Sequence, residues 1–147
     1  MHAIYYEYGG IRPNPLVQDV DAAAELGRKN KVDVILAAGG GSVIDSAKII
    51  SIAIPVRHSS WDFYAGKATP HKAVPLIVVL TLASSGSEMN PFAVLSNHET
   101  MIKTGFRSDL IYPAHSFLDP CFTVTVPADY TAYGIADLIS QIGRAHV

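Results

Sequence analysis

Three consecutive glycines followed by a serine, Gly39 to Ser42, are well suited to bind a phosphate group. They follow an apolar run and precede a segment with helical spacing. Glycines there let backbone N–H groups approach a ligand that the helix N-terminus attracts. The segment matches neither G-x-G-x-x-G nor the ATP-binding G-x-x-x-x-G-K-[ST] loop. A phosphate site and a plain tight turn are therefore both open on these residues alone.

A second polar segment, Thr81 to Glu88, carries a threonine and three serines directly after another apolar run. Hydroxyl groups at the end of a strand can bond the ribose or phosphates of a cofactor, or cap their own backbone. Two such segments in one small sheet favour ligand binding, because α/β sheets bind ligands at the carboxyl ends of their strands. The serines do not form the G-x-S-x-G motif, so we set a serine hydrolase aside.

Apolar runs and helical spacing alternate along the chain and place both polar segments after strands. We expect a helix from about Pro15 to Asn30 with Asn14 as its N-cap, because proline is tolerated at the first helical position. Short apolar runs predict strands, the first two of them buried, at 31–38, 75–80, 92–95 and 115–118. Helix, strand, glycine turn and helix together indicate an α/β layer.

A second helix follows the glycines, and a third begins beyond Pro127. Ser42 and Asp45 form a capping box for the second helix, whose apolar residues fall on one face. Residues 57–72 have the character of a loop. The last residues, 141–147, continue the apolar pattern weakly and supply no helix-ending motif, so we expect them to be a non-native tail.

Length, composition and charge favour one globular unit whose partner is a small molecule or another protein. With 147 residues, 49% of them hydrophobic, the chain can bury a core. A formal net charge of -2 and scattered basic residues give no footprint for nucleic acid or for a membrane surface. A single cysteine and a first stretch without signal-peptide character predict a soluble, cytoplasmic protein.

Four segments, taken together, resemble the iron-containing alcohol dehydrogenases, and the butanol dehydrogenase-like, aldehyde-reducing branch in particular. The segments are EYGGIRPNP at 7–15, AGGGSVIDSAK at 38–48, TLASSGSE at 81–88 and FLDP at 117–120. The resemblance implies an α/β fold, with a partial Rossmann-like parallel sheet of the dehydroquinate synthase-like type, and then a helical domain. Residues 1–127 would belong to the dinucleotide-binding domain and 128–140 to the first helix of the helical domain.

The resemblance also implies NAD or NADP as cofactor and assigns polar positions to it. Gly41 and Ser42 would meet the pyrophosphate, Asp45 would help to shape the loop, and Lys103 would reach the nicotinamide ribose. The full set of implied cofactor-binding residues is Gly40, Gly41, Ser42, Asp45, Thr81, Ser85, Asn90, Lys103 and Thr125. The residue that selects NAD or NADP lies outside the part of the family that this sequence matches.

The catalytic metal of the family, iron or zinc, would lie between the two domains. Asp137 matches the first metal ligand, which the family follows with a histidine four residues later on the same helix face. Gln141 stands at that position here, and the six histidines show no ligand spacing. We therefore expect no catalytic residue and weak or no metal binding within this chain, although the complete enzyme would use the metal.

The activity implied by the resemblance is hydride transfer between a nicotinamide cofactor and a small alcohol or aldehyde. We expect the chain alone to be inactive and to associate through exposed apolar surface, and we expect a homo-oligomer. Three alternatives stay open: a nucleotide-binding module without redox chemistry, a remnant that binds nothing, and a dehydroquinate synthase-like or glycerol dehydrogenase-like enzyme. The segments at 7–15 and 119–120 favour the alcohol dehydrogenase branch over the last of these.

Overall fold

A computed structural model describes residues 4–144 of the chain, with side chains described as far as 141. Its centre is a parallel sheet in the order β1-β2-β5, formed by β1 (Ile35–Gly39), β2 (Leu76–Leu80) and β5 (His115–Phe117). The first polar segment therefore follows β1 and the second follows β2, side by side at one edge of the sheet. The expected α/β class with a parallel sheet is confirmed.

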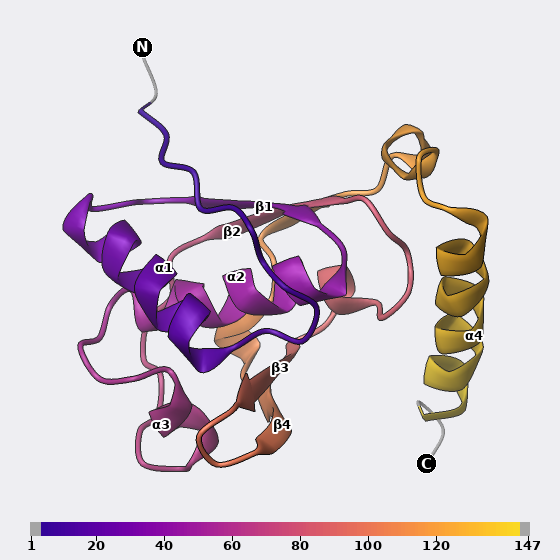
Figure 1. Cartoon of the computed structure of the whole chain (residues 1–147). Coiled ribbons are helices and arrows are strands. Elements are labelled where there is room, and N and C mark those ends of the chain that lie inside the picture. The colour runs from indigo at the N-terminus through magenta and orange to yellow at the C-terminus, as the bar shows by residue number, and fades with distance from the viewer. Residues whose placement is uncertain (1–3, 145–147) are drawn as a thin grey trace.

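Helix α2 (Gly41–Ala53) lies between this sheet and an antiparallel hairpin of β3 (Phe92–Asn97) and β4 (Ile102–Arg107), as Figure 1 shows. Helix α1 (Val17–Lys29) packs beside α2. Because neighbours cover α2 on several sides, most of its residues are buried, unlike those of a surface helix with a single apolar stripe.

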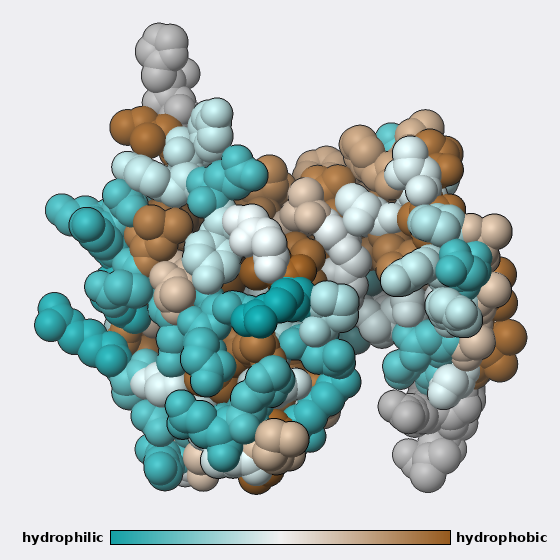
Figure 2. Space-filling model, in the orientation of Figure 1, coloured by the Kyte–Doolittle hydropathy of each residue, from teal (hydrophilic) through white to brown (hydrophobic). Residues whose placement is uncertain are grey.

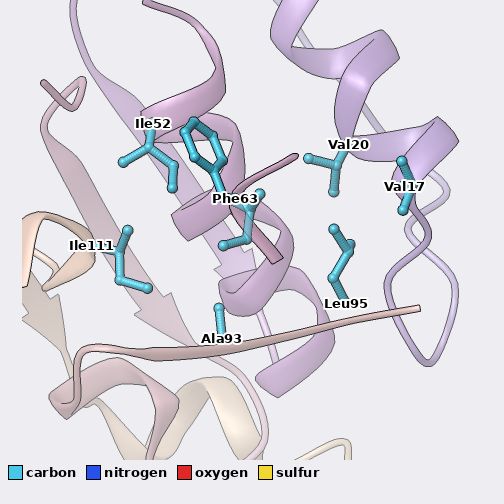
Figure 3. Close-up of a cluster of buried hydrophobic side chains, with 8 residues drawn as sticks. Val17, Val20, Ile52, Phe63, Ala93, Leu95 and Ile111 are labelled. Atoms are coloured by element: carbon cyan, nitrogen blue, oxygen red, sulfur yellow. The ribbon is translucent and has the colours of Figure 1, made fainter. Parts of the chain in front are cut away.

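The largest group of buried apolar side chains joins α1, α2 and the hairpin (Figure 3). Its members are Val17, Val20, Ile49, Ile52, Phe63, Ala93, Leu95 and Ile111. A second group packs α2 against the sheet, with Ile44 and Ala47 facing Leu76 and Val78. Because apolar side chains are buried on both sides of α2, the position of this helix is fixed, and so is the position of its first turn.

Five shorter or more distant elements complete the described chain. They are α3 (Trp61–Tyr64), the 3-10 helices η1 (Ser87–Met89), η2 (Asp109–Ile111) and η3 (Pro120–Thr123), and the last helix α4 (Ala128–Arg144). In Figure 1, α4 stands beside the rest of the molecule and extends past residue 140, to which we had expected it to run. Residues 141–144 of the expected non-native tail belong to this helix. Residues 145–147 of the tail lie outside the described residues.

Two predicted helix starts are wrong. Asn14 does not cap α1: it has a φ of 62°, and the helix begins at Val17 after Leu16, with no side-chain cap. The reason is tertiary, because the carbonyl of Pro15 accepts a hydrogen bond from the Ser96 amide at 2.8 Å, so the chain runs beside β3 first. The capping box at Ser42 is also absent, since α2 begins at Gly41 and its N-cap is Gly40, two residues before the predicted cap.

Two further predictions need correction in the loops and strands. The segment 57–72 is not all loop, because it contains α3, and β4 was not predicted at all. The first strand begins at Ile35 rather than at residue 31, and only one of its faces is buried. Leu36 on the other face keeps 65% of its surface exposed, because α1 and α2 both lie on the opposite side of the sheet.

Apolar side chains are also exposed on α4 and on the segment before it. Figure 2 shows hydrophobic surface along this part of the molecule. The exposed residues there are Phe117, Leu118, Phe122, Val124, Tyr130, Tyr133, Ile135, Leu138 and Ile139. None of the helices in the described part of the chain is both long enough and apolar enough to cross a membrane.

Candidate cofactor site

The glycine segment (39–42) and the serine segment (81–88) meet at the carboxyl ends of β1 and β2. The amide of Thr81 donates to the carbonyl of Gly39 at 3.1 Å, which continues the pairing of the two strands by one residue. A Cβ atom added to Gly41 would lie only 2.6 Å from the Ser85 Oγ, and one on Gly40 would lie 3.2 Å from Leu82. The two segments therefore approach each other so closely that Gly41 leaves no room for a side chain.

The same contact brings the N-terminus of a helix to the edge of the sheet. Gly41 and Ser42 lie in the first turn of α2, where backbone N–H groups have no carbonyl of their own helix to bond. The helix dipole adds a partial positive charge at this end. Backbone N–H groups without a bulky side chain, next to serine hydroxyls, form a cradle that fits the pyrophosphate of a dinucleotide.

Lys103 reaches this site from the hairpin. Its Nζ donates to the Oδ1 of Asn14 at 2.6 Å, and the amide of Asn14 lies 3.4 Å from the Ser42 Oγ. Burial raises the pKa of Asp45, and the charge of the exposed Lys103 offsets part of that increase. The structure thus brings the lysine and Ser42 together through Asn14, which we had interpreted as a helix cap.

Asp45 points into the body of the protein instead of toward its own helix end. Its Oδ1 accepts a hydrogen bond from the Ser87 Oγ at 2.6 Å, and its Oδ2 accepts one from the Val94 amide at 2.9 Å. Burial raises the pKa of Asp45, and these two hydrogen bonds and the nearby lysines offset part of that increase. Asp45 therefore holds α2 to the serine segment and to β3, and its role in shaping the cofactor loop stays a prediction.

Asn90 and Thr125 lie in different surroundings. The Asn90 side chain bonds the carbonyl of Gly86 at 2.9 Å and the amide of Phe92 at 2.9 Å, so it closes the turn that ends the serine segment. Thr125 is exposed in the turn between η3 and α4 and, among the described contacts, joins neither Gly41 nor Ser85. Of the expected cofactor residues, Thr125 is thus the one that the structure leaves apart from the others.

The residues around Asp137 do not by themselves fit a catalytic metal. Ser84 donates to the Oδ2 of Asp137 at 2.6 Å, and the Nε2 of Gln141 donates to its Oδ1 at 3.3 Å. Both carboxylate oxygens are thus engaged within the chain. Within residues 4–144, no group of three His, Cys, Asp or Glu side chains is placed to hold a metal ion. A carboxylate with a serine and an amide lacks the donors that iron or zinc requires.

Two polar residues at the centre of this site, Lys48 and Ser87, were not among the predicted ones. Lys48 has no exposed surface, and its Nζ bonds Ser87 and two backbone carbonyls beyond it. A signal was present in the sequence, because Ile44, Lys48 and Ile52 recur at intervals of four on one face of the helix. A lysine within an apolar stripe requires buried partners, and this pattern could have marked it.

Comparison with known proteins shows the family of this chain. Residues 2–120 match the sequence profile of the iron-containing alcohol dehydrogenases. The match covers most of the chain, and the chain therefore belongs to that family.

Similar proteins include several with known cofactors. The chain is 41% identical over 140 residues to the probable NADH-dependent butanol dehydrogenase 2 of Bacillus subtilis, covering 95% of this chain and 36% of that protein. It is 40% identical over 134 residues to the NADPH-dependent aldehyde reductase YqhD of Escherichia coli, covering 89% of this chain and 35% of that protein.

A solved structure confirms the likeness of the folds. The crystal structure of NADH-dependent butanol dehydrogenase A from Thermotoga maritima superposes with a TM-score of 0.90 at 41% identity, covering 93% of this chain and 34% of that one. The chain thus spans about a third of the length of the relatives that it matches.

Proposed function

We propose that the chain forms the cofactor-binding part of an NAD(P)-dependent alcohol dehydrogenase or aldehyde reductase. Such an enzyme transfers hydride between a nicotinamide and a small alcohol or aldehyde. The observation that carries the proposal is the approach of Gly41 to Ser85, where a Cβ atom would lie 2.6 Å from the hydroxyl. It joins a helix N-terminus to serine hydroxyls at the ends of two parallel strands, which is where α/β sheets bind nucleotides.

Five of the predicted residues have distinct tasks in this proposal. The N–H groups of Gly41 and Ser42 bind the pyrophosphate, and Ser85 and Thr81 supply hydroxyls beside it. Lys103, held by Asn14 at 2.6 Å, gives a positive charge toward the nicotinamide ribose. The nicotinamide supplies or accepts the hydride when the cofactor is bound, and the chain binds and orients it.

The complete enzyme requires a divalent metal, iron or zinc, whose ligands extend beyond this chain. Asp137 is the one ligand that we assign here, and its two oxygens are already bonded to Ser84 and Gln141. We therefore propose that the isolated chain does not turn over substrate. The exposed apolar side chains on the sheet and on α4 support a homo-oligomer or a further covering domain. A cytoplasmic location is part of the same proposal.

The first test is cofactor binding, measured by the fluorescence of NADH and NADPH titrated with the protein expressed from its complete gene. We expect saturable binding of at least one of them, and oxidation of that cofactor at 340 nm when butanal is added. Binding without oxidation of any small aldehyde would favour the nucleotide-binding module, and absence of both would leave a remnant.

A matched pair of glycine variants tests the site itself. Gly41→Ala places a methyl group against the Ser85 hydroxyl, which must rotate away from its place beside the cofactor, so we expect cofactor affinity to fall ~10-fold or more. Gly9→Ala is the control, because a Cβ atom at Gly9 lies 3.9 Å from its nearest neighbour. Equal affinity of both variants for the cofactor would contradict the placement of the site.

A further inference from the structure

Lys48 lies at the centre of the molecule and is not assigned a task by the proposed function. It has no exposed surface, and it stands on the α2 face that also carries the fully buried Ile44 and Ile52. An ammonium group is costly to remove from water unless it is fully hydrogen-bonded. The buried ammonium of Lys48 therefore requires hydrogen-bond acceptors within the protein.

The acceptors all come from one short segment of the chain. The Lys48 Nζ lies 3.0 Å from the Ser87 Oγ, 2.7 Å from the carbonyl oxygen of Asn90 and 2.8 Å from that of Phe92. The side-chain oxygen of Asn90 is 3.1 Å away. The three protons of the ammonium therefore hold residues 87–92, which are the end of the serine segment and the residues that follow it.

Ser87 connects this lysine to Asp45. The hydroxyl proton of Ser87 is donated to the Asp45 Oδ1 at 2.6 Å, so its lone pairs remain free to accept from Lys48. The second oxygen of Asp45 accepts the Val94 amide at 2.9 Å. Lys48 and Asp45, one turn apart on α2, thus both hydrogen-bond Ser87. Together they hold the serine segment and β3 to the helix.

We propose that Lys48 is a positioning residue for cofactor binding: through Ser87 and the carbonyls of Asn90 and Phe92 it keeps Ser85 beside Gly41. This inference rests on the proposed function, since it assigns a task within the same site. Gly86, between Ser85 and Ser87, turns the chain with a φ of 66°, and the Asn90 side chain holds its carbonyl at 2.9 Å, so a hold on Ser87 and Asn90 also fixes the position of Ser85.

The alternative is a lysine that only stabilises the core. Both hypotheses predict that loss of the ammonium lowers the melting temperature. They differ in the folded protein, because only a positioning residue changes the affinity for the cofactor at temperatures far below unfolding. A separate destabilising change on the same helix, distant from the serine segment, therefore provides the matched control.

The experiment compares Lys48→Met with Ile52→Ala in the protein expressed from its complete gene. Methionine fills a similar volume without donors, whereas Ile52 packs in the cluster around Phe63. Melting temperatures and dissociation constants for NADH and NADPH are measured at a temperature where all variants are folded. We expect both variants to melt earlier, but only Lys48→Met to bind its cofactor ~10-fold more weakly, as expected for the loss of hydrogen bonds to a charged group.

Ser87→Ala is the second variant, and it decides the matter if Lys48→Met does not fold. It leaves the lysine in place but removes the bridge to Asp45, so we expect affinity to fall ~3-fold or more. If Lys48→Met folds and its cofactor affinity is unchanged, the inference is overturned while the proposed function stands. If Lys48→Met does not fold, unchanged cofactor affinity of Ser87→Ala has the same consequence. Equal weakening by Ile52→Ala also overturns it. A wild-type protein that binds neither cofactor overturns the proposed function, and this inference with it.

Discussion

Two helices carry an aspartate toward the serine segment, and the two aspartates are held differently. Ser87 donates to Asp45 on α2 at 2.6 Å, and Ser84 donates to Asp137 on α4 at the same distance. The carboxylate on α2 has a buried lysine and a backbone amide as further neighbours. The carboxylate on α4 has only the longer contact with Gln141 at 3.3 Å among its described partners.

The comparison teaches that one short segment can bond both a buried helix and a largely exposed one. Helix α2 is buried between the sheet and the hairpin, so its hydrogen bonds act in surroundings of low polarity, where each is stronger. Helix α4 exposes most of its apolar side chains, and it meets the segment mainly at Gly134 and Asp137. The two serine–aspartate hydrogen bonds, although equal in length, therefore stabilise their contacts unequally.

The largest expected effect comes from removing each carboxylate in turn. Asp45→Ala removes the stronger of the two anionic neighbours of the buried Lys48 and leaves the Ser87 hydroxyl and the Val94 amide without their acceptor, so we expect a loss of about 4 kcal/mol in the free energy of unfolding. Asp137→Ala removes a partly exposed hydrogen bond, and we expect a loss of about 1 kcal/mol or less. Urea unfolding followed by circular dichroism measures both. Similar losses for the two variants would show that the surroundings of the aspartates do not differ in the way described.

The pH dependence of stability sharpens the comparison, because only the α2 site contains a buried lysine. Burial lowers the pKa of Lys48 from 10.5 to about 8, and the nearby Asp45 and Glu88 offset part of this. Between these values the unfolded chain binds more protons than the folded one, so stability rises with pH. From pH 8 to 10.5 the free energy of unfolding of the wild type should therefore rise by up to ~3 kcal/mol relative to that of Lys48→Met. Urea unfolding at several pH values measures this difference. A constant difference between the two proteins would contradict the lowered pKa.

A third prediction concerns the contact of α4. A Cβ atom on Gly134 would lie 2.7 Å from the carbonyl oxygen of Ala83, and a backbone atom cannot simply rotate away. Gly134→Ala should therefore separate α4 from the serine segment at a cost of about 1–2 kcal/mol. Hydrogen exchange should show faster opening of α4 and unchanged protection of α2. The exposed position Ala132→Ser serves as the control, and an equal effect there would exclude the close contact as the cause.

The smallest difference is expected between the two serines themselves. Ser84→Ala should cost about 0.5–1 kcal/mol, since water can replace the lost donor near the surface. Ser87→Ala, at a buried position, should cost about 1–3 kcal/mol because the Asp45 oxygen is left unsatisfied. Thermal unfolding of the two variants, measured side by side, gives the ranking. The opposite order would mean that Ser87 is less tightly bound than its distances indicate.

Local patterns were enough to predict the parallel sheet and the meeting of the two polar segments at its carboxyl end. Apolar runs predicted β1, β2 and β5, and the positions of Gly41 and Ser85 after two of these strands brought them together correctly. Strand β4 was missed, because its sequence IKTGFR lies largely exposed and lacks an apolar run. Its pairing with β3 depends on the register of the hairpin rather than on its own composition.

The errors at helix starts have the same physical origin. A sequence pattern describes local hydrogen bonds, whereas Asp45 and Pro15 bond residues far along the chain. Asp45 accepts from Val94, 49 positions away, instead of capping its own helix. The role of Lys48 was hidden for the same reason, since its acceptors at residues 87–92 are brought to it only by the completed fold.

The link between Asn14 and Lys103 also bears on how the chain folds during synthesis. These two residues are 89 positions apart, and the amide of Ser96 bonds the carbonyl of Pro15 nearby. The segment before α1 therefore cannot dock until the whole hairpin has left the ribosome. Contacts with such large sequence separation carry a high entropy of loop closure and form late. Exposure of the N-terminal segment to proteases and chaperones should last until translation has passed the hairpin.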